Sequence, residues 1–175
     1  MHVLDHTIAT YVDLIRSPWI TEYLYLLTIL FDITVASVLA TVGFVVLIYL
    51  VRGKKYALLF LITMVAGAAI AYILKLVFNV SRPTNGILQV FGSSFPSYHA
   101  TVATIFFCML MFVFDTYLKG VWKILFNFFC ILSIFLVALS RVYLGVHWTS
   151  DVVGGIILGL GITYISITSY KRYAK

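Results

Sequence analysis

The chain has 175 residues, of which 63% are hydrophobic and 10% are charged, and its mean hydropathy is +1.09. This composition excludes an ordinary soluble globular protein and indicates a polytopic membrane protein. The formal net charge of +6 does not indicate nucleic-acid binding, because no soluble basic face is expected to carry it. We therefore predict an all-α integral membrane helical bundle, as a single domain over residues 1–175.

The first element expected in the chain is a short amphipathic helix. Residues 3–16 place apolar side chains close to helical spacing, with acids and histidine between them. Such a pattern favours a helix that lies in the membrane interface, here as part of an interfacial segment over residues 1–20. A secretory signal peptide is not expected, because the segment lacks an apolar core and a small-residue cleavage site.

Five stretches are apolar and long enough to span a bilayer, so we predict about five transmembrane helices. Asp32 interrupts the first stretch, whose start (Trp19 to Phe31) is expected either to lie along the interface or to extend past it. The last stretch carries Gly155 and Gly159, whose spacing favours close helix packing. Three of the connections are short, whereas the loop from Val80 to Tyr98 is long. The predicted spans cover residues 24–51, 55–79, 99–118, 122–140 and 150–170.

Basic residues are distributed unevenly between the two sides of the membrane. Eight of the twelve Lys and Arg residues fall on one side. The positive-inside rule places that side in the cytoplasm, so the other side faces outward. Trp19 and Trp148 are then expected to anchor the outer interface, and Trp122 the inner one. The eight basic residues are Arg52, Lys54, Lys55, Lys119, Lys123, Lys171, Arg172 and Lys175.

Six ionisable residues fall near helix ends on the predicted outward side. Ionisable groups at membrane depth are costly and mark function by default. Three of the six are fixed cations, which bind phosphate oxygens and stabilise a transferring phosphoryl group. Ser97, near a predicted helix start, adds a hydroxyl and nearby backbone N–H groups. The six residues are Lys75, Arg82, His99, Arg141, His147 and Asp151.

The two histidines in this set supply what hydrolysis of a phosphate ester requires. A neutral imidazole attacks phosphorus, and a second imidazole protonates the leaving oxygen. His147 and Asp151 stand four residues apart and share one helix face, so the carboxylate can orient the ring, and His99 would be the acid. Each residue alone also has a purely structural explanation, such as a local hydrogen bond or a lipid contact. Their joint placement on one side favours a site.

Three strings of the sequence resemble the motifs of the type 2 phosphatidic acid phosphatase superfamily, which also includes the vanadium haloperoxidases. The family motifs are K-x6-R-P, P-S-G-H and S-R-x5-H-x3-D. The first and third match fully, and the second departs at one position, where Tyr98 replaces glycine. The resemblance covers about residues 70–160. The strings here read Lys75-LVFNVS-Arg82-Pro83, then Pro96-Ser97-Tyr98-His99, then Ser140-Arg141-VYLGV-His147-WTS-Asp151.

The resemblance implies a phosphohydrolase that needs neither metal nor cofactor. By this likeness His147 is the nucleophile that forms a phosphohistidine, Asp151 orients it, and His99 protonates the leaving group. The remaining motif residues would bind the phosphate, and a tyrosine at position 98 suggests either ordinary backbone dihedrals there or a ring that shapes the pocket. Zinc bound by the histidines and Asp151 is disfavoured, because the neighbouring cations would repel it. The predicted phosphate-binding residues are Lys75, Arg82, Ser97, Tyr98 and Arg141.

The expected function is a membrane lipid phosphatase of the bacterial inner membrane, with an outward-facing site. The substrates left open are lipid A 1-phosphate, undecaprenyl pyrophosphate and phosphatidylglycerophosphate. The expected partners are this phosphorylated lipid and the bilayer; the oligomeric state is open. Two alternatives remain, a lipid phosphotransferase that uses the same intermediate and a non-enzymatic phospholipid-binding or transport protein. A haloperoxidase is less favoured, because a large soluble helical domain is lacking.

Overall fold

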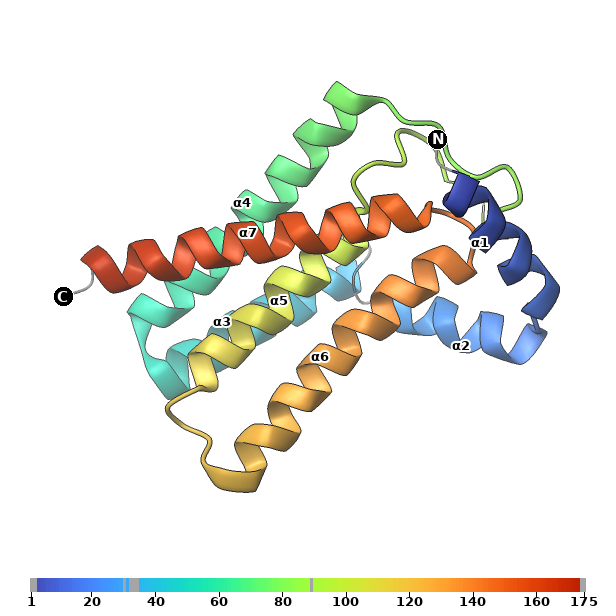
Figure 1. Cartoon of the computed structure of the whole chain (residues 1–175). Helices are drawn as coiled ribbons and strands as arrows, with labels where there is room; N and C mark the ends of the chain where they lie inside the picture. The colour runs from blue at the N-terminus through green and yellow to red at the C-terminus, as the bar shows by residue number, and fades with distance from the viewer. Residues whose placement is uncertain (1–2, 30, 32–34, 89, 174–175) are drawn as a thin grey trace.

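The structure, a computed structural model, describes residues 3–29, 31, 35–88 and 90–173. Every regular element within these ranges is an α-helix, as the composition predicts (Figure 1). Asp32 and Lys175 lie outside the described residues. The helices are α1 (Val3–Ile15), α2 (Pro18–Ile29), α3 (Val35–Arg52), α4 (Lys54–Phe78), α5 (Tyr98–Phe114), α6 (Gly120–Tyr143) and α7 (Thr149–Tyr173).

Helices α4, α6 and α7 are long and apolar enough to cross a membrane. They contain 25, 24 and 25 residues, and at about 1.5 Å per residue each exceeds the ~30 Å of a hydrocarbon core. Helices α3 and α5 are apolar but shorter. The predicted bundle of about five apolar helices is confirmed, and the last four predicted spans agree with α4 to α7 within a few residues.

The predicted first span over residues 24–51 is wrong, because two helices occupy this part of the chain. Helix α2 ends at Ile29 and α3 begins at Val35. Helix α2 begins at Pro18, a residue well suited to a first helical position because it has no N–H to leave unpaired. The two helices have different neighbours, since α2 packs on α6 whereas α3 packs on α4. One straight helix could not make both contacts.

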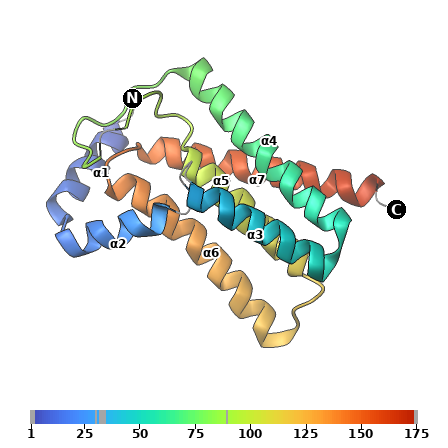
Figure 2. The same ribbon diagram turned by 180° about the vertical axis from the view of Figure 1, so that it is seen from behind.

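Helix α5 lies at the centre of the bundle, between α4, α6 and α7 (Figures 1 and 2). Its sequence is apolar on all sides, and most of its residues are buried, as expected of a helix without a solvent-facing side. Helix α7 approaches it closely at two glycines. A Cβ at Gly155 would lie 2.7 Å from Ser97 O, and one at Gly159 would lie 2.8 Å from Thr101 O. The predicted close packing at these glycines is confirmed.

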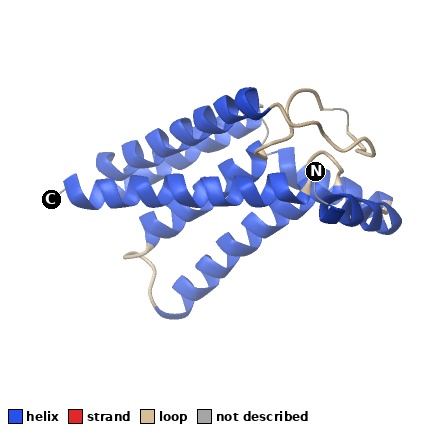
Figure 3. Ribbon diagram, turned by 45° about the horizontal axis from the view of Figure 1, so that its top comes forward, coloured by secondary structure: helices blue, strands red, loops and turns tan. Residues whose placement is uncertain are grey.

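The two ends of the bundle differ in character. Figure 3 shows the long loop of residues 79–97 and the N-terminal helix at one end, with the C-terminus at the opposite end. Helix α1 exposes apolar side chains, including Val3, Leu4 and Leu14, and buries Asp5 and Val12. The predicted amphipathic helix is therefore present, but a carboxylate lies on its buried side.

The prediction that Trp148 anchors the outer interface is wrong. Its side chain is 6% exposed, and its indole Nε1 donates a hydrogen bond to Ser81 O at 2.8 Å. A tryptophan in a membrane interface keeps its polar N–H at the water boundary, whereas this one uses it to hold the long loop. Trp19 and Trp122 are exposed on the surface of the bundle, as interfacial tryptophans require.

Candidate active site

The structure brings the predicted residues to one end of the bundle, where four helix ends and two loops meet. Lys75 lies in the last turn of α4 and Arg141 in the last turn of α6. His99 and Asp151 lie in the first turns of α5 and α7. Arg82 belongs to the loop of residues 79–97, and the sixth residue, His147, belongs to the loop between α6 and α7.

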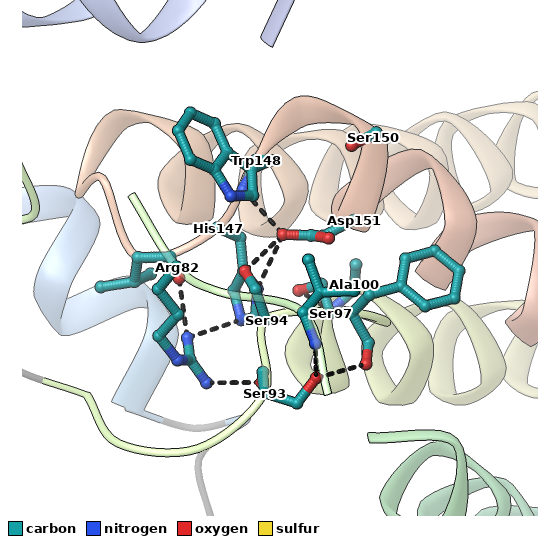
Figure 4. Close-up of polar contacts among 12 residues, drawn as sticks. Arg82, Ser93, Ser94, Ser97, Ala100, His147, Trp148, Ser150 and Asp151 are labelled. Atoms are coloured by element: carbon teal, nitrogen blue, oxygen red, sulfur yellow. Dashed lines mark hydrogen bonds and ion pairs between the residues drawn. The ribbon is translucent and has the colours of Figure 1, made fainter. Parts of the chain in front are cut away.

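The His147 ring is held on its Nδ1 side by a carboxylate and a hydroxyl (Figure 4). Nδ1 lies 3.6 Å from Asp151 Oδ2 and 3.3 Å from Ser94 Oγ. The Ser94 hydroxyl donates a hydrogen bond to the same Asp151 oxygen, which also accepts the Trp148 backbone N–H at 2.8 Å. All three side chains of this group are buried. The pair predicted from i, i+4 spacing is therefore present, and Ser94 completes it.

The opposite ring nitrogen of His147 faces a cation. Arg82 NH1 lies 3.5 Å from His147 Nε2. A guanidinium group can only donate, so the nitrogen that faces it must carry the lone pair. The ring proton then lies on Nδ1, toward Asp151. We assign this tautomer from the hydrogen-bond network, and it is the one in which Nε2 can attack an electrophile.

Burial and surrounding positive charge lower the pKa of His147 to about 4. Burial is the largest cause, the hydrogen bond to Asp151 opposes it, and the charges of Arg82, Lys75 and Arg141 act in the same direction as burial. The imidazole is therefore neutral at neutral pH, as a nucleophile must be.

Two of these cations are oriented by backbone carbonyls of the long loop. Lys75 Nζ donates to Ser93 O at 2.8 Å and to Ser94 O at 3.3 Å. Arg82 donates from Nε to Gly92 O at 2.9 Å, and from NH2 to Ser93 O at 3.1 Å. Its NH1 also donates to Val146 O at 2.7 Å. Carbonyl acceptors orient a cation without cancelling its charge, so both groups stay able to bind an anion.

Ser97 joins the beginnings of α5 and α7. It is the N-cap of α5, where its hydroxyl accepts the Ala100 N–H at 3.5 Å. Its own backbone N–H donates to Asp151 O at 3.0 Å. The residue is fully buried. Ser97 therefore links the two helix starts that carry His99 and Asp151, in addition to the phosphate contact predicted for it.

Tyr98, His99 and Arg141 complete the set of predicted residues. His99 is 7% exposed and Arg141 is 5% exposed. Tyr98 is partly buried against the main apolar cluster, and its ring centroid lies 6.1 Å from that of His99. Among the described non-glycine residues only Asn79 has a positive φ. The tyrosine that replaces the motif glycine therefore adopts ordinary helical geometry.

Ser93 and Ser94 are site residues that the sequence analysis missed. Ser93 O accepts from both Lys75 and Arg82, and Ser94 bonds to Asp151. The available signal was a pair of adjacent hydroxyl residues between Gly92 and Pro96, in the loop that joins the first two motifs. This signal is weak, because neutral serines in a loop are common.

The described residues offer no group of three or more His, Cys, Asp or Glu side chains that could hold a metal ion. The absence of a metal from the reaction stays a prediction.

Comparison with known proteins places this arrangement in a family. The family model of the PAP2 superfamily matches residues 55–175, which include every predicted site residue. The chain belongs to the PAP2 superfamily. An undecaprenyl-diphosphatase of Sulfolobus acidocaldarius is 29% identical over 123 residues, 66% of this chain. The match spans 56% of that relative's own length.

Two solved structures are similar to nearly the whole chain. One is the transmembrane PAP2-type phosphatidylglycerolphosphate phosphatase of Bacillus subtilis, with a TM-score of 0.87 and 25% identity, covering 97% of this chain and 86% of that one. The other is LpxE of Aquifex aeolicus, with a TM-score of 0.78 and 21% identity, covering 95% of this chain and 96% of that one. The membrane protein predicted from the composition and the PAP2 family predicted from the motifs are confirmed.

Proposed function

We propose that the protein is an integral-membrane phosphatase that removes a phosphate group from a phosphorylated lipid, as one domain over residues 1–175. The observation that carries the proposal is the environment of His147, whose Nδ1 is held by Asp151 and Ser94 while Nε2 faces Arg82. This arrangement gives a neutral nucleophile pointed at a group of cations, as attack on a phosphate requires.

The reaction proceeds in two steps. In the first, His147 Nε2 forms a bond to phosphorus, the bond to the leaving oxygen breaks, and His99 transfers a proton to that oxygen. In the second, water attacks the phosphohistidine, His99 accepts a proton from it, and phosphate leaves. Lys75, Arg82 and Arg141 bind the equatorial oxygens, where negative charge collects in the transition state.

The proposed substrate class is a lipid phosphate or pyrophosphate, namely phosphatidylglycerophosphate, a polyprenyl pyrophosphate or the 1-phosphate of lipid A. The position of the site at the ends of membrane helices supports a substrate presented from the bilayer. The names of two similar proteins, an undecaprenyl-diphosphatase and a phosphatidylglycerolphosphate phosphatase, support the same class.

We further propose a bacterial inner membrane location with the site on the periplasmic side. The support is the distribution of basic residues. The ends of α3 and α7 and the start of α4 carry Arg52, Lys171, Arg172, Lys54 and Lys55, and cytoplasmic segments are enriched in such residues. The site lies at the other end of the bundle.

The test is a phosphate-release assay on purified protein across phosphatidylglycerophosphate, polyprenyl pyrophosphate, phosphatidic acid and lipid A. We expect release from at least one lipid and none from His147→Ala. Phosphate release by the His147→Ala variant would contradict the phosphohistidine mechanism. A phosphorylated lipid product without free phosphate would identify a phosphotransferase instead, and binding without turnover would identify a lipid-binding or transport protein.

A further inference from the structure

The first turn of α7, which carries Asp151, is not capped by the residue that precedes it. The first N–H groups of a helix lack partners within the helix, and a Ser, Thr, Asp or Asn side chain at the N-cap usually accepts one. Here the N-cap position holds Trp148, whose indole is a donor only. Asp151 supplies one half of a capping box, because Oδ2 accepts the Trp148 N–H. The acceptor for a free N–H group in the first turn of α7 must therefore come from another part of the chain.

Asp5 of α1 supplies the missing acceptor. Its Oδ1 accepts the Ser150 backbone N–H at 3.0 Å, and its Oδ2 accepts the Ser150 hydroxyl at 2.8 Å. Asp5 is 5% exposed, so water competes little for these bonds. A carboxylate at a helix N-terminus is also stabilised by the helix dipole. A residue 145 positions away in the sequence thus completes the cap of α7.

Further contacts hold α1 over the site end of the bundle. Arg16, which follows α1, donates from Nε to Tyr143 O at 3.1 Å and from NH1 to Asn85 O at 2.8 Å. The ring of His6 lies 4.8 Å from that of Trp148. Helix α1 and Arg16 therefore contact the end of α6, the long loop and the start of α7, the segments that carry two of the three fixed cations, Arg141 and Arg82, and Asp151.

We propose that Asp5 is a positioning residue of the active site, which aligns His147 and Asp151 by capping α7 through Ser150. The inference rests on the proposed function, in which His147 is the nucleophile. Ser150 directly precedes Asp151 and lies three residues after His147, so a shift of this turn moves both groups. Because reacting atoms must meet within about 3–3.5 Å, a displacement of about 1 Å costs up to about 100-fold in rate.

The kinetic test compares Asp5→Ala, Asp5→Glu and Asp5→Asn with Glu22→Ala, which removes an exposed acid from α2. Rates are expressed per folded, monodisperse enzyme. We expect Asp5→Ala and Asp5→Glu to lose about 10-fold or more in kcat with KM within about twofold, since only alignment is lost. Asp5→Asn keeps an acceptor for the Ser150 N–H and should retain most of the rate. Glu22→Ala should match the wild type.

Hydrogen–deuterium exchange of residues 146–153 gives a readout that does not depend on activity. We expect faster exchange in Asp5→Ala and unchanged exchange in Glu22→Ala. Wild-type exchange or wild-type kcat in Asp5→Ala overturns the proposal, as does an equal loss in Asp5→Asn. If Asp5→Ala does not fold, Asp5→Glu carries the test, because it keeps the charge but displaces the carboxylate. If the wild-type protein releases no phosphate from any lipid, the proposed function fails, and exchange still decides whether Asp5 caps α7.

Discussion

Arg82 NH1 lies 3.5 Å from His147 Nε2, so a cation faces the nitrogen that carries the lone pair. The contact has two consequences. It selects the tautomer with the proton on Nδ1, and it places the proposed phosphate-binding group next to the atom that we propose attacks phosphorus. The charge of Arg82 also helps to keep the imidazole neutral. In the proposed mechanism, substrate binding and nucleophile activation therefore depend on the same residue.

The low pKa of His147 predicts the acid limit of activity. Because this pKa is about 4, protonation of His147 should lower kcat/KM only as pH approaches about 4, where it removes the lone pair. The pH–rate profile, corrected for the second ionisation of the substrate phosphate, measures this limit. A midpoint near the ordinary histidine value of 6.5 would contradict the assignment. Asp151→Asn replaces the carboxylate that raises the pKa of His147 by a neutral amide, so the midpoint of this variant should move lower.

Ser94→Ala tests the residue that the sequence analysis missed. The change removes a hydroxyl that bonds to Asp151 beside His147. A hydrogen bond to a charged group contributes about 1.5–3 kcal/mol, so kcat should fall by about 10- to 100-fold with KM little changed. Ser133→Ala, at an exposed position of α6, is the matched control and should keep wild-type kinetics. Equal rates in the two variants would show that Ser94 does not contribute to the reaction.

Lys75→Ala tests the proposed phosphate clamp. Lys75 is oriented by two carbonyl groups of the long loop, and loss of a preorganised charge at a developing anion costs about 100-fold or more in rate. We expect that loss in kcat/KM, measured by phosphate release. Lys54→Ala removes an exposed cation at the other end of the same helix and should change the rate by less than about twofold. Similar losses in both variants would indicate a general charge effect.

Gly155→Ala tests the close packing of α7 on α5. The added Cβ would lie 2.7 Å from Ser97 O, a backbone atom that cannot move aside as a flexible side chain can. We expect a loss of about 1–3 kcal/mol in unfolding free energy, seen as a lower thermal midpoint in detergent. Gly161→Ala meets no described atom within 4 Å and should be neutral or slightly stabilising. Identical midpoints would show that α7 can shift away from α5.

Removal of metal ions should leave activity unchanged. The proposed chemistry uses an imidazole nucleophile and fixed cations, so an excess of chelator should not lower phosphate release. Loss of turnover with chelator and its recovery with a divalent ion would contradict the metal-free mechanism.

The sequence by itself determined the helical membrane fold, the order of the motif residues and the end of the bundle where they gather. Those features follow from local patterns, since a span needs a run of about 20 apolar residues and the His147–Asp151 pair needs only i, i+4 spacing on one helix. The glycine contacts of α7 were predictable for the same reason, because small residues four apart share one face.

Only the tertiary structure decided how the loops and the N-terminal helix complete the site. The bond of Asp5 to Ser150, the role of Ser94 between His147 and Asp151, and the burial of Trp148 all join segments far apart in the chain. Which polar group finds which partner there depends on the path of the backbone in space. Periodicity carries no information about that path, because buried donors and acceptors are paired by proximity in the fold and not by spacing in the sequence.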